Sequence, residues 1–308
     1  MRSARAGGLV ATAVAAGLLA APGISAQTKA RAPATHDCGS GVSIRLSAPA
    51  ASQGGLLEAE LRSAAPLVEV KADWAGHEIS FWQAAKSKNL QRALLGVDLE
   101  REPGNYDLKL DAQLPGGKAV ACAVVVAVKA GKFPIEKLTV DKQFVEPSPQ
   151  DAERAEKEGQ RLHEIYARVT PERLWQGNFR LPLNGARNAK NFGRQRVLNG
   201  QPRSPHSGVD LPASAGTPVH AAQRGRVVLA ENLFYAGNTV VIDHGLGVYT
   251  LYAHMESLAV AEGDSVQAGA NLGRVGATGR VTGPHLHWGL IVDQARVNAL
   301  QILSLPLS

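Results

Sequence analysis

The chain has 308 residues, of which 44% are hydrophobic and 19% charged, and its formal net charge is +6. This length allows one or two globular domains, and the composition excludes a largely disordered chain. The basic residues do not alternate with aromatic residues, so no nucleic-acid partner is expected.

The first 26 residues have the three-part layout of a secretory signal peptide. Arg2 and Arg5 precede an apolar run over about residues 7–21, and small residues lead up to Ala26. The apolar run is short for a membrane span, and no cysteine nearby offers a lipid attachment site. Residues 1–26 are therefore predicted to be removed on export to the periplasm or cell envelope, or on secretion, with no stable membrane insertion afterwards. A retained anchor is the alternative. Removing two arginines lowers the formal charge from +6 to +4, which suits an anionic polymer or ordinary solubility.

Residues 38–130 contain short alternating segments separated by turn sequences. About seven strands at a spacing near ten residues are typical of an immunoglobulin-like β-sandwich. The expected strands are 42–48, 55–63, 67–74, 77–83, 93–100, 106–114 and 119–128. Cys38 and Cys122 are the two cysteines of the chain. In an oxidising compartment such a pair favours one disulfide, with two buried free thiols as the alternative.

Residues 131–170 are interpreted as a connector that includes one helix, starting at Ser148. Ser148 is a suitable N-cap, Pro149 suits the first helical position, and Asp151 occupies a capping-box position. A narrow apolar stripe with a charged face opposite predicts a helix docked on a domain. The stripe consists of Ala152, Ala155, Leu162, Ile165 and Val169.

Residues 171–308 change to short valine- and leucine-rich segments with glycine-bearing turns. This pattern predicts an antiparallel β domain.

Three histidine motifs in this last part carry the candidate chemistry. HSGVD runs from His206 to Asp210 in a predicted loop that enters a strand, YAHM contains His254, and HLH contains His285 and His287. Residues i and i+2 of a strand point to the same face, so His285 and His287 should project side by side. Zinc accepts imidazole and carboxylate ligands, and a catalytic site uses three of them. One motif alone is weak evidence, but together they supply the ligands of a zinc hydrolase and two further imidazoles for proton transfer.

The three segments resemble the lysostaphin- or LytM-type zinc metallopeptidases, which cut the peptide part of peptidoglycan. The resemblance rests on HSGVDLPASAGTPVHAAQRGRV, GNTVVIDHGLGVYTLYAHM and EGDSVQAGANLGRVGATGRVTGPHLHWGL, in the order of the family. It covers roughly residues 175–300, while the preceding part resembles exported members with an immunoglobulin-like front domain more loosely.

The resemblance implies a role for each of the five residues in these motifs. His206, Asp210 and His287 are implied to hold one Zn²⁺ per chain. His254 and His285 are implied to be the catalytic pair that orients or deprotonates the attacking water and stabilises the tetrahedral intermediate.

Two further histidines and one loop are less informative. His244, in IDHG, matches a family histidine usually taken as structural, and His220, in PVHAA, could line the cleft or simply pack. The loop before His206 keeps the Phe192 and Gly193 of the family, and it leaves the width of the cleft open.

The fold prediction is a mainly β protein with three parts. An N-terminal immunoglobulin-like β-sandwich at 38–130 is followed by a connector with a linker helix at 131–170. A C-terminal antiparallel β metallopeptidase domain occupies residues 171–308.

The predicted function is that of an exported zinc-dependent endopeptidase acting on amide bonds in peptidoglycan stem peptides or crosslinks. A crosslink from D-alanine to diaminopimelate is favoured over a glycine bridge. The alternative is a non-catalytic cell-wall-binding or amidase-activating scaffold of the same fold, although such proteins usually lack the ligands. A biotin or lipoyl carrier needs a modifiable lysine, and none follows Lys190. A D-Ala-D-Ala carboxypeptidase would have a longer first His–Asp spacing than HSGVD offers.

Overall fold

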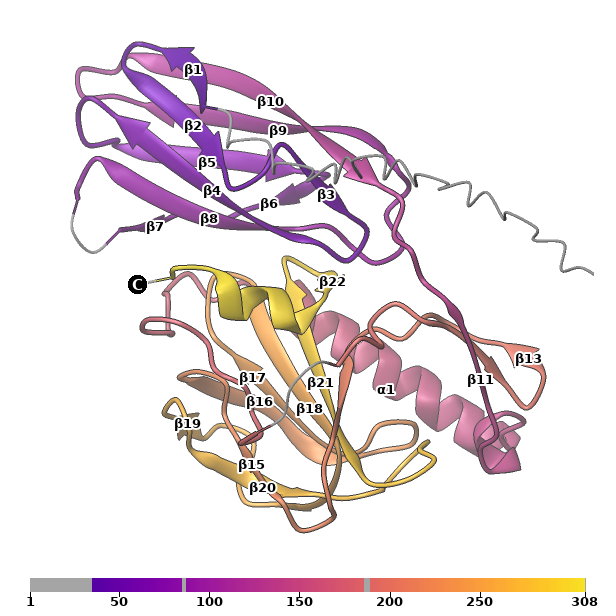
Figure 1. Cartoon of the computed structure of the whole chain (residues 1–308). Helices are drawn as coiled ribbons and strands as arrows, with labels where there is room; N and C mark the ends of the chain where they lie inside the picture. The colour runs from indigo at the N-terminus through magenta and orange to yellow at the C-terminus, as the bar shows by residue number, and fades with distance from the viewer. Residues whose placement is uncertain (1–34, 85–86, 186–188, 308) are drawn as a thin grey trace, which may run out of the picture. The chain divides into compact units, whose positions relative to one another are not determined.

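The structure, a computed structural model, describes residues 35–84, 87–185 and 189–307. The predicted signal peptide, residues 1–26, lies outside the described residues. The described part of the chain is mainly β, as the sequence predicts (Figure 1). None of its helices is long and apolar enough to cross a membrane.

The N-terminal part forms two five-stranded sheets around one hydrophobic core. Their strand orders are β1-β2-β4-β8-β7 and β3-β10-β9-β5-β6. The strands are β1 Thr35–Gly39, β2 Val42–Leu46, β3 Ala50–Ser52, β4 Leu56–Ser63, β5 Glu69–Trp74, β6 His77–Glu78, β7 Trp82–Gln83, β8 Leu90–Gly96, β9 Gly104–Gln113 and β10 Ala119–Lys129. Alternation sets the two faces, since Val124 and Val126 are buried whereas Val125 between them is 58% exposed. An immunoglobulin-like topology and the domain boundaries stay predictions.

The predicted single strand at 77–83 is wrong. The chain forms β6 and β7 there, and these two-residue strands belong to different sheets. The buried side chains of Ile79 and Trp82 accompany this crossing between sheets, so one extended strand with a single buried face does not form. The sequence pattern does not predict β1 or the three-residue β3, which pairs in parallel with β10.

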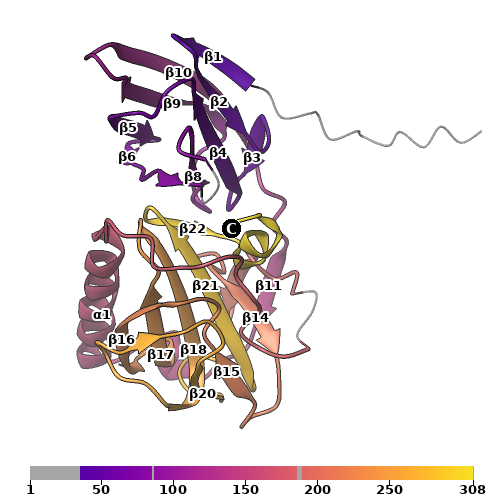
Figure 2. The ribbon, with the colours of Figure 1, turned by 90° about the vertical axis from the view of Figure 1, so that its left-hand side faces the viewer.

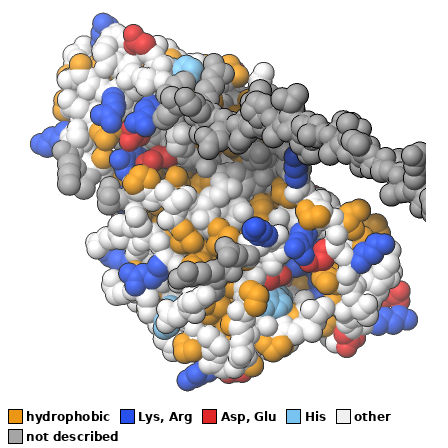
Figure 3. All heavy atoms as spheres, in the orientation of Figure 1, with side chains coloured by type: hydrophobic (Ala, Val, Ile, Leu, Met, Phe, Trp, Pro, Cys, Tyr) orange, Lys and Arg blue, Asp and Glu red, His pale blue; other side chains and the backbone are white. Residues whose placement is uncertain are grey.

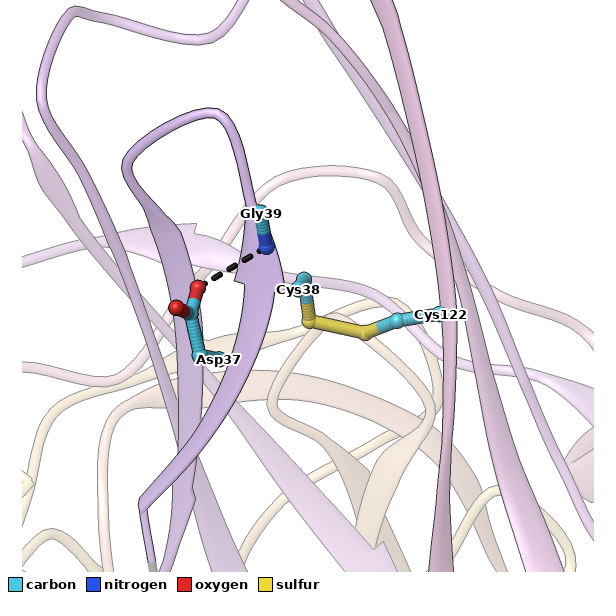
Figure 4. The surroundings of a disulfide bond; sticks show 4 residues. All are labelled: Asp37, Cys38, Gly39 and Cys122. Atoms are coloured by element: carbon cyan, nitrogen blue, oxygen red, sulfur yellow. Dashed lines mark hydrogen bonds between the residues drawn. A yellow bond between two sulfur atoms is a disulfide. The ribbon is translucent and has the colours of Figure 1, made fainter.

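A disulfide joins Cys38 on β1 to Cys122 on β10 and so links the two sheets (Figure 4). This confirms the predicted pairing. Beside it, the backbone N–H of Gly39 donates to Asp37 Oδ1 at 2.8 Å. The two cysteines are 84 residues apart, and closing such a loop contributes at most on the order of 4–5 kcal/mol in the chain-entropy model.

Helix α1, Pro149–Ala167, follows a short 3₁₀ turn at Lys142–Phe144 and begins at the predicted N-cap. The Ser148 hydroxyl accepts from the N–H of Asp151 at 3.1 Å. The predicted stripe is wrong at its C-terminal end, because Val169 lies beyond the helix and is 48% exposed. Arg168 already has an extended backbone, and Pro171 disfavours helical conformation in the residue before it.

The C-terminal part is a nine-stranded sheet in which every pair of strands is antiparallel, as predicted. The elements are β14 Val209–Pro212, β15 Pro218–His220, β16 Gly225–Leu233, β17 Gly237–Asp243, β18 Val248–Leu258, β19 Ser265–Val266, β20 Asn271–Val275, β21 His285–Val292, β22 Ala295–Val297 and the 3₁₀ helix η2 Ala299–Ser304. Ile165 of α1 packs with Leu229, Tyr249 and Ile291 of this sheet, and Figure 2 shows the helix along its side.

A small three-stranded sheet lies outside this arrangement. Strand β11, Ile135–Leu138, pairs in parallel with β12, Gln195–Leu198, which also pairs with β13, Gln201–Pro202. The sequence pattern does not predict a strand in the connector. This pairing brings the connector next to the loop that precedes His206.

Candidate metal centre

The pairing of β14 with β21 brings the first candidate ligands together. Asp210 lies directly opposite His287 in the register, and His206 lies in the loop that enters β14. Asp210 Oδ1 is 2.8 Å from His287 Nδ1 and 2.9 Å from His206 Nε2. The two ring nitrogens are 3.0 Å apart. The three residues thus form a group whose ligand atoms converge closely enough to hold one metal ion.

The hydrogen bonding of His206 shows that this group suits a cation. Its Nδ1 lies 2.8 Å from the carbonyl oxygen of Asn191, and because a carbonyl only accepts, Nδ1 carries the proton. In this tautomer His206 presents a lone pair on Nε2 to the Asp210 carboxylate, 2.9 Å away. Such closely spaced acceptors repel one another unless a positive charge lies among them. Two imidazoles and a carboxylate are a donor set that zinc accepts.

Asp210 is held in its ionised form. Burial raises its pKa, but the neighbouring imidazoles of His206 and His287 outweigh burial and hold the pKa well below the usual range. Burial lowers the pKa of His287 to about 4 despite its hydrogen bond to Asp210. The Arg196 guanidinium also lies 3.2 Å from Asp210 Oδ2. The carboxylate is therefore ready to bind a cation.

Gly208 makes room for the His287 ring. A Cβ atom at this position would lie 2.6 Å from His287 Nε2 and 2.8 Å from the backbone oxygen of Trp288. Both distances are shorter than real Cβ contacts allow. Since Trp288 is fully buried, the ring of His287 has to move if residue 208 gains a side chain.

We expect Gly208→Ala to weaken zinc binding by roughly 10- to 100-fold, the range found when groups that support a ligand are disturbed. Competition with a chromogenic chelator measures this affinity. Gly159→Ala is the matched control, because a Cβ on this glycine of α1 meets nothing within 4 Å. Equal affinities of the two variants would contradict the role of Gly208.

His254 lies on β18 in an unusual backbone conformation. Its φ is 63°, in the left-handed region that non-glycine residues rarely adopt. The register between β17 and β18 shifts here, because Asn238 pairs with Met255 while Val240 pairs with Tyr252. The bulge re-aims the histidine side chain. Such conformations cost of order 1–3 kcal/mol and cluster at functional sites.

The His254 ring is fixed through one nitrogen. Nδ1 lies 2.9 Å from the carbonyl oxygen of Thr278 and therefore donates to it. The Thr278 hydroxyl in turn donates to the Met255 carbonyl at 2.7 Å and accepts from the N–H of Asn238 at 2.9 Å. Burial, followed by His287 and His285, lowers the pKa of His254 to about 3. The ring is thus neutral, with its lone pair on Nε2.

His285 is arranged in the same way. Its Nδ1 donates to the Gly283 carbonyl at 2.8 Å, and its Nε2 lies 3.6 Å from Asp210 Oδ1. Its ring centroid is 5.0 Å from that of His254. Along β21, Leu286 and Trp288 are fully buried on the opposite face, so the predicted side-by-side projection of the HLH pair is confirmed. Within the described residues, the Nε2 atoms of His254 and His285 have no hydrogen-bond partner and lie next to the candidate ligands.

A cavity of about 40 Å³ lies beside these groups. Asp210, His254 and His285 line it, together with Leu138 and Val140 from the connector. Two arginines, Arg196 and Arg280, complete its polar wall. On the face seen in Figure 3, Lys and Arg side chains lie close to a histidine.

His220 and His244 do not line this cavity. His244 is fully buried, with Nδ1 2.8 Å from the Arg224 carbonyl oxygen and Nε2 2.7 Å from Thr250 Oγ1. His220 is half-buried, and its Nδ1 lies 3.2 Å from the Gly269 carbonyl oxygen. Their contacts are those of packed residues.

His244 should make stability depend on pH. Burial lowers its pKa from 6.5 to about 4, so between these values the unfolded chain binds a proton that the folded chain does not. The free energy of unfolding should therefore fall as the pH drops through this window, by about 3 kcal/mol from this residue. Urea unfolding is measured at about pH 7.5 and about pH 4.5. The free energy of unfolding should fall less between these two pH values in His244→Gln than in the wild type. An equal loss would assign the effect to other groups.

Sequence reasoning missed the groups that position the five predicted residues. Asn191 accepts from His206 Nδ1 through its carbonyl and from the N–H of Asp210 through its side chain at 3.1 Å. Thr278 and Gly283 act through backbone carbonyls, which carry no side-chain signal. Arg196 and Arg280 could have been noticed only as arginines near the motifs.

The fold and this cluster define a metal-binding β domain with the residues of a hydrolase. Residues 204–299 match the sequence profile "Peptidase family M23". The chain therefore carries a peptidase M23 domain, as the resemblance implied.

Individual relatives agree with this. Over 207 residues the chain is 34% identical to the peptidoglycan DD-endopeptidase ShyA of Vibrio cholerae, covering 67% of this chain and 44% of ShyA. Over 97 residues it is 42% identical to the DD-carboxypeptidase/endopeptidase Mpg of Neisseria meningitidis, covering 32% of this chain and 22% of Mpg. The chain thus spans less than half the length of these curated relatives.

A solved structure is similar over most of the chain. It is that of a putative M23 peptidase from Pseudomonas aeruginosa, with a TM-score of 0.63 and 27% sequence identity. The match covers 82% of this chain and 94% of that one.

Proposed function

We propose that the protein is an exported zinc-dependent endopeptidase that hydrolyses amide bonds in peptidoglycan stem peptides or crosslinks. The observation that carries this proposal is the convergence of one carboxylate oxygen and two imidazole nitrogens at 2.8 to 3.0 Å from one another. The name of ShyA, a peptidoglycan DD-endopeptidase, supports the choice of substrate, and the name of Mpg, a DD-carboxypeptidase/endopeptidase, supports the type of reaction.

His206, Asp210 and His287 would hold the metal. The Asn191 carbonyl fixes the tautomer of His206, so Nε2 is the nitrogen available to a cation. When bound, zinc supplies a Lewis acid that polarises a carbonyl and lowers the pKa of water from about 16 toward 7. The remaining chemistry falls to the neighbouring side chains.

His254 and His285 would move the proton. Each ring donates from Nδ1 to a backbone carbonyl, so each presents Nε2 as a base. One Nε2 accepts the proton of the attacking water and returns it to the amine as the amide bond breaks. The other, after it takes a proton from solvent, donates a hydrogen bond to the oxyanion of the tetrahedral intermediate. General acid–base assistance of this kind contributes typically 10²- to 10⁴-fold to the rate.

Export is supported by the sequence of residues 1–26, which has the layout of a signal peptide. The Cys38–Cys122 disulfide fits an oxidising compartment such as the periplasm or cell envelope. Peptidoglycan is reachable from there.

Digestion of purified sacculi by the full chain tests the proposal. The enzyme is used as purified, after treatment with a chelator, and after zinc is restored, and released fragments are identified by mass spectrometry. New amine ends within crosslinked peptides, lost with chelator and regained with zinc, are expected. Bound zinc without cleavage would refute the proposed hydrolysis of peptidoglycan. Neither zinc nor cleavage would favour the non-catalytic scaffold.

A further inference from the structure

Arg280 is a charged side chain at the candidate site that the mechanism above does not use. It is half-buried and lines the same cavity as His254 and His285. Within the described part of the chain, its guanidinium makes no ion pair and no hydrogen bond. An arginine in this position has donors to offer to a ligand.

Tyr235 holds Arg280 in place. The guanidinium lies over the Tyr235 ring, 4.5 Å from its centroid, and the N–H of Arg280 donates to the Tyr235 carbonyl at 2.8 Å. The preceding Gly279 has a φ of 75°, and a Cβ there would collide with the backbone N of Gly237. Stacking fixes the plane of the guanidinium and leaves its edge free for hydrogen bonding.

Two further arginines, Arg196 and Arg203, lie near Arg280, and the Asp210 carboxylate lines the same cavity. Burial, with Arg196 and Arg203 nearby, lowers the pKa of Arg280. Arg196 already pairs with Asp210, whereas Arg203 donates to the Val145 carbonyl and to Gln201, which are neutral acceptors. An anion beside Arg280 would relieve the repulsion among these guanidinium groups.

The loop that follows Arg280 adds backbone donors. Val281 and Thr282 line the same cavity, and their N–H groups have no acceptor among the hydrogen bonds of the described residues. The cavity of about 40 Å³ has room for a single small group such as a carboxylate. An arginine fork with nearby N–H groups is a recurrent carboxylate-binding arrangement.

We propose that Arg280 is a specificity-determining residue that binds a free α-carboxylate adjacent to the scissile amide. The carboxylate belongs to the residue whose amine is released. Because Arg280 and the candidate bases share one small cavity, the bound group lies within a few bonds of the reacting carbonyl. A crosslink to the amine of diaminopimelate carries such a carboxylate, and a glycine bridge does not. This inference rests on the proposed function and names its substrate class.

Two matched peptide substrates test it. One is a crosslinked peptide dimer with the free α-carboxylate beside the scissile amide, and the other carries a carboxamide at that position. Wild-type chain should prefer the carboxylate in kcat/KM by roughly 10- to 100-fold, as expected for charge-assisted hydrogen bonds. Arg280→Ala should lose this preference by slowing only the carboxylate substrate, and Arg280→Lys should recover part of it.

Two further variants separate recognition from packing. Tyr235→Ala should lower the preference because it releases the guanidinium, whereas Arg226→Ala should not, because Arg226 is exposed on β16 and does not line the cavity. If kcat/KM of Arg280→Ala falls equally for both substrates, or does not fall at all, the proposal is overturned.

Calorimetric binding of the same peptides to zinc-free chain gives a readout independent of activity. An Arg280-dependent preference in binding without any cleavage by the wild type would support the carboxylate site and refute the proposed hydrolysis. Cleavage with no carboxylate preference in either assay would support the proposed hydrolysis and refute the carboxylate site.

Discussion

An Asp210→Ala chain is expected to lose bound zinc and, with it, hydrolysis of peptidoglycan. Asp210 Oδ1 is the atom shared by the cluster, since it lies 2.9 Å from His206 Nε2 and 2.8 Å from His287 Nδ1. Without the carboxylate, two imidazoles remain and the charge that balances the cation is gone. Disturbing a group that only supports a ligand costs about 10- to 100-fold in metal affinity, so removing the ligand itself should cost more than about 100-fold.

Zinc content after dialysis, measured by atomic absorption, and release of crosslinked fragments from sacculi check this expectation. Asp210→Asn keeps the size of the side chain but not its charge. It should lose nearly as much zinc and activity as Asp210→Ala. Asp264→Ala is the matched control, since Asp264 is exposed and its carboxylate accepts from the N–H of Ala261 in a turn. A fully zinc-loaded Asp210→Ala chain would remove Asp210 from the ligand set.

The sequence allowed the prediction of those parts of the site that depend on side-chain identity and strand alternation. His285 and His287 share one face of β21 because successive residues of a strand alternate. Their distance from His206 and Asp210 follows from the register of β14 on β21, which no local pattern specifies. The family resemblance supplied that link.

What could not be predicted depends on the backbone and on distant pairing. The left-handed φ of His254 follows from a bulge opposite β17, and histidine has no strong preference for that conformation. The carbonyls of Thr278 and Asn191, which set two tautomers, belong to every peptide unit. Strand β11 forms only because β12, more than 50 residues later, pairs with it.

The errors in the fold prediction also arise from the backbone and from distant pairing. Alternation predicts a strand wherever residues fit one, but it does not show that the segment at 77–83 divides between two sheets. Apolar spacing extended the helix to Val169, although the effect of Pro171 on the residue before it already favours an earlier end. Local patterns therefore predict element type better than they predict ends and partners.

His254→Ala should differ from Asp210→Ala, because it should keep zinc while losing turnover. Within the described residues His254 is not in the group of converging ligand atoms, but its ring centroid is 5.0 Å from that of His285 and 5.8 Å from that of His287. Its Nδ1 is committed to the Thr278 carbonyl, so only Nε2 can take part in proton transfer. Loss of this base should lower kcat by about 10²- to 10⁴-fold with little change in zinc affinity.

His254→Asn makes the test sharper, because asparagine tolerates the left-handed conformation found at this position. Its side-chain amide can still donate a hydrogen bond, but it offers no base. If turnover falls equally in the alanine and asparagine variants while both keep zinc, the loss reflects the missing Nε2 rather than a collapsed bulge. His163→Ala, on α1, controls for removal of a histidine as such. Zinc loss equal to that of Asp210→Ala would instead make His254 a ligand, and unchanged turnover would leave proton transfer to His285 alone.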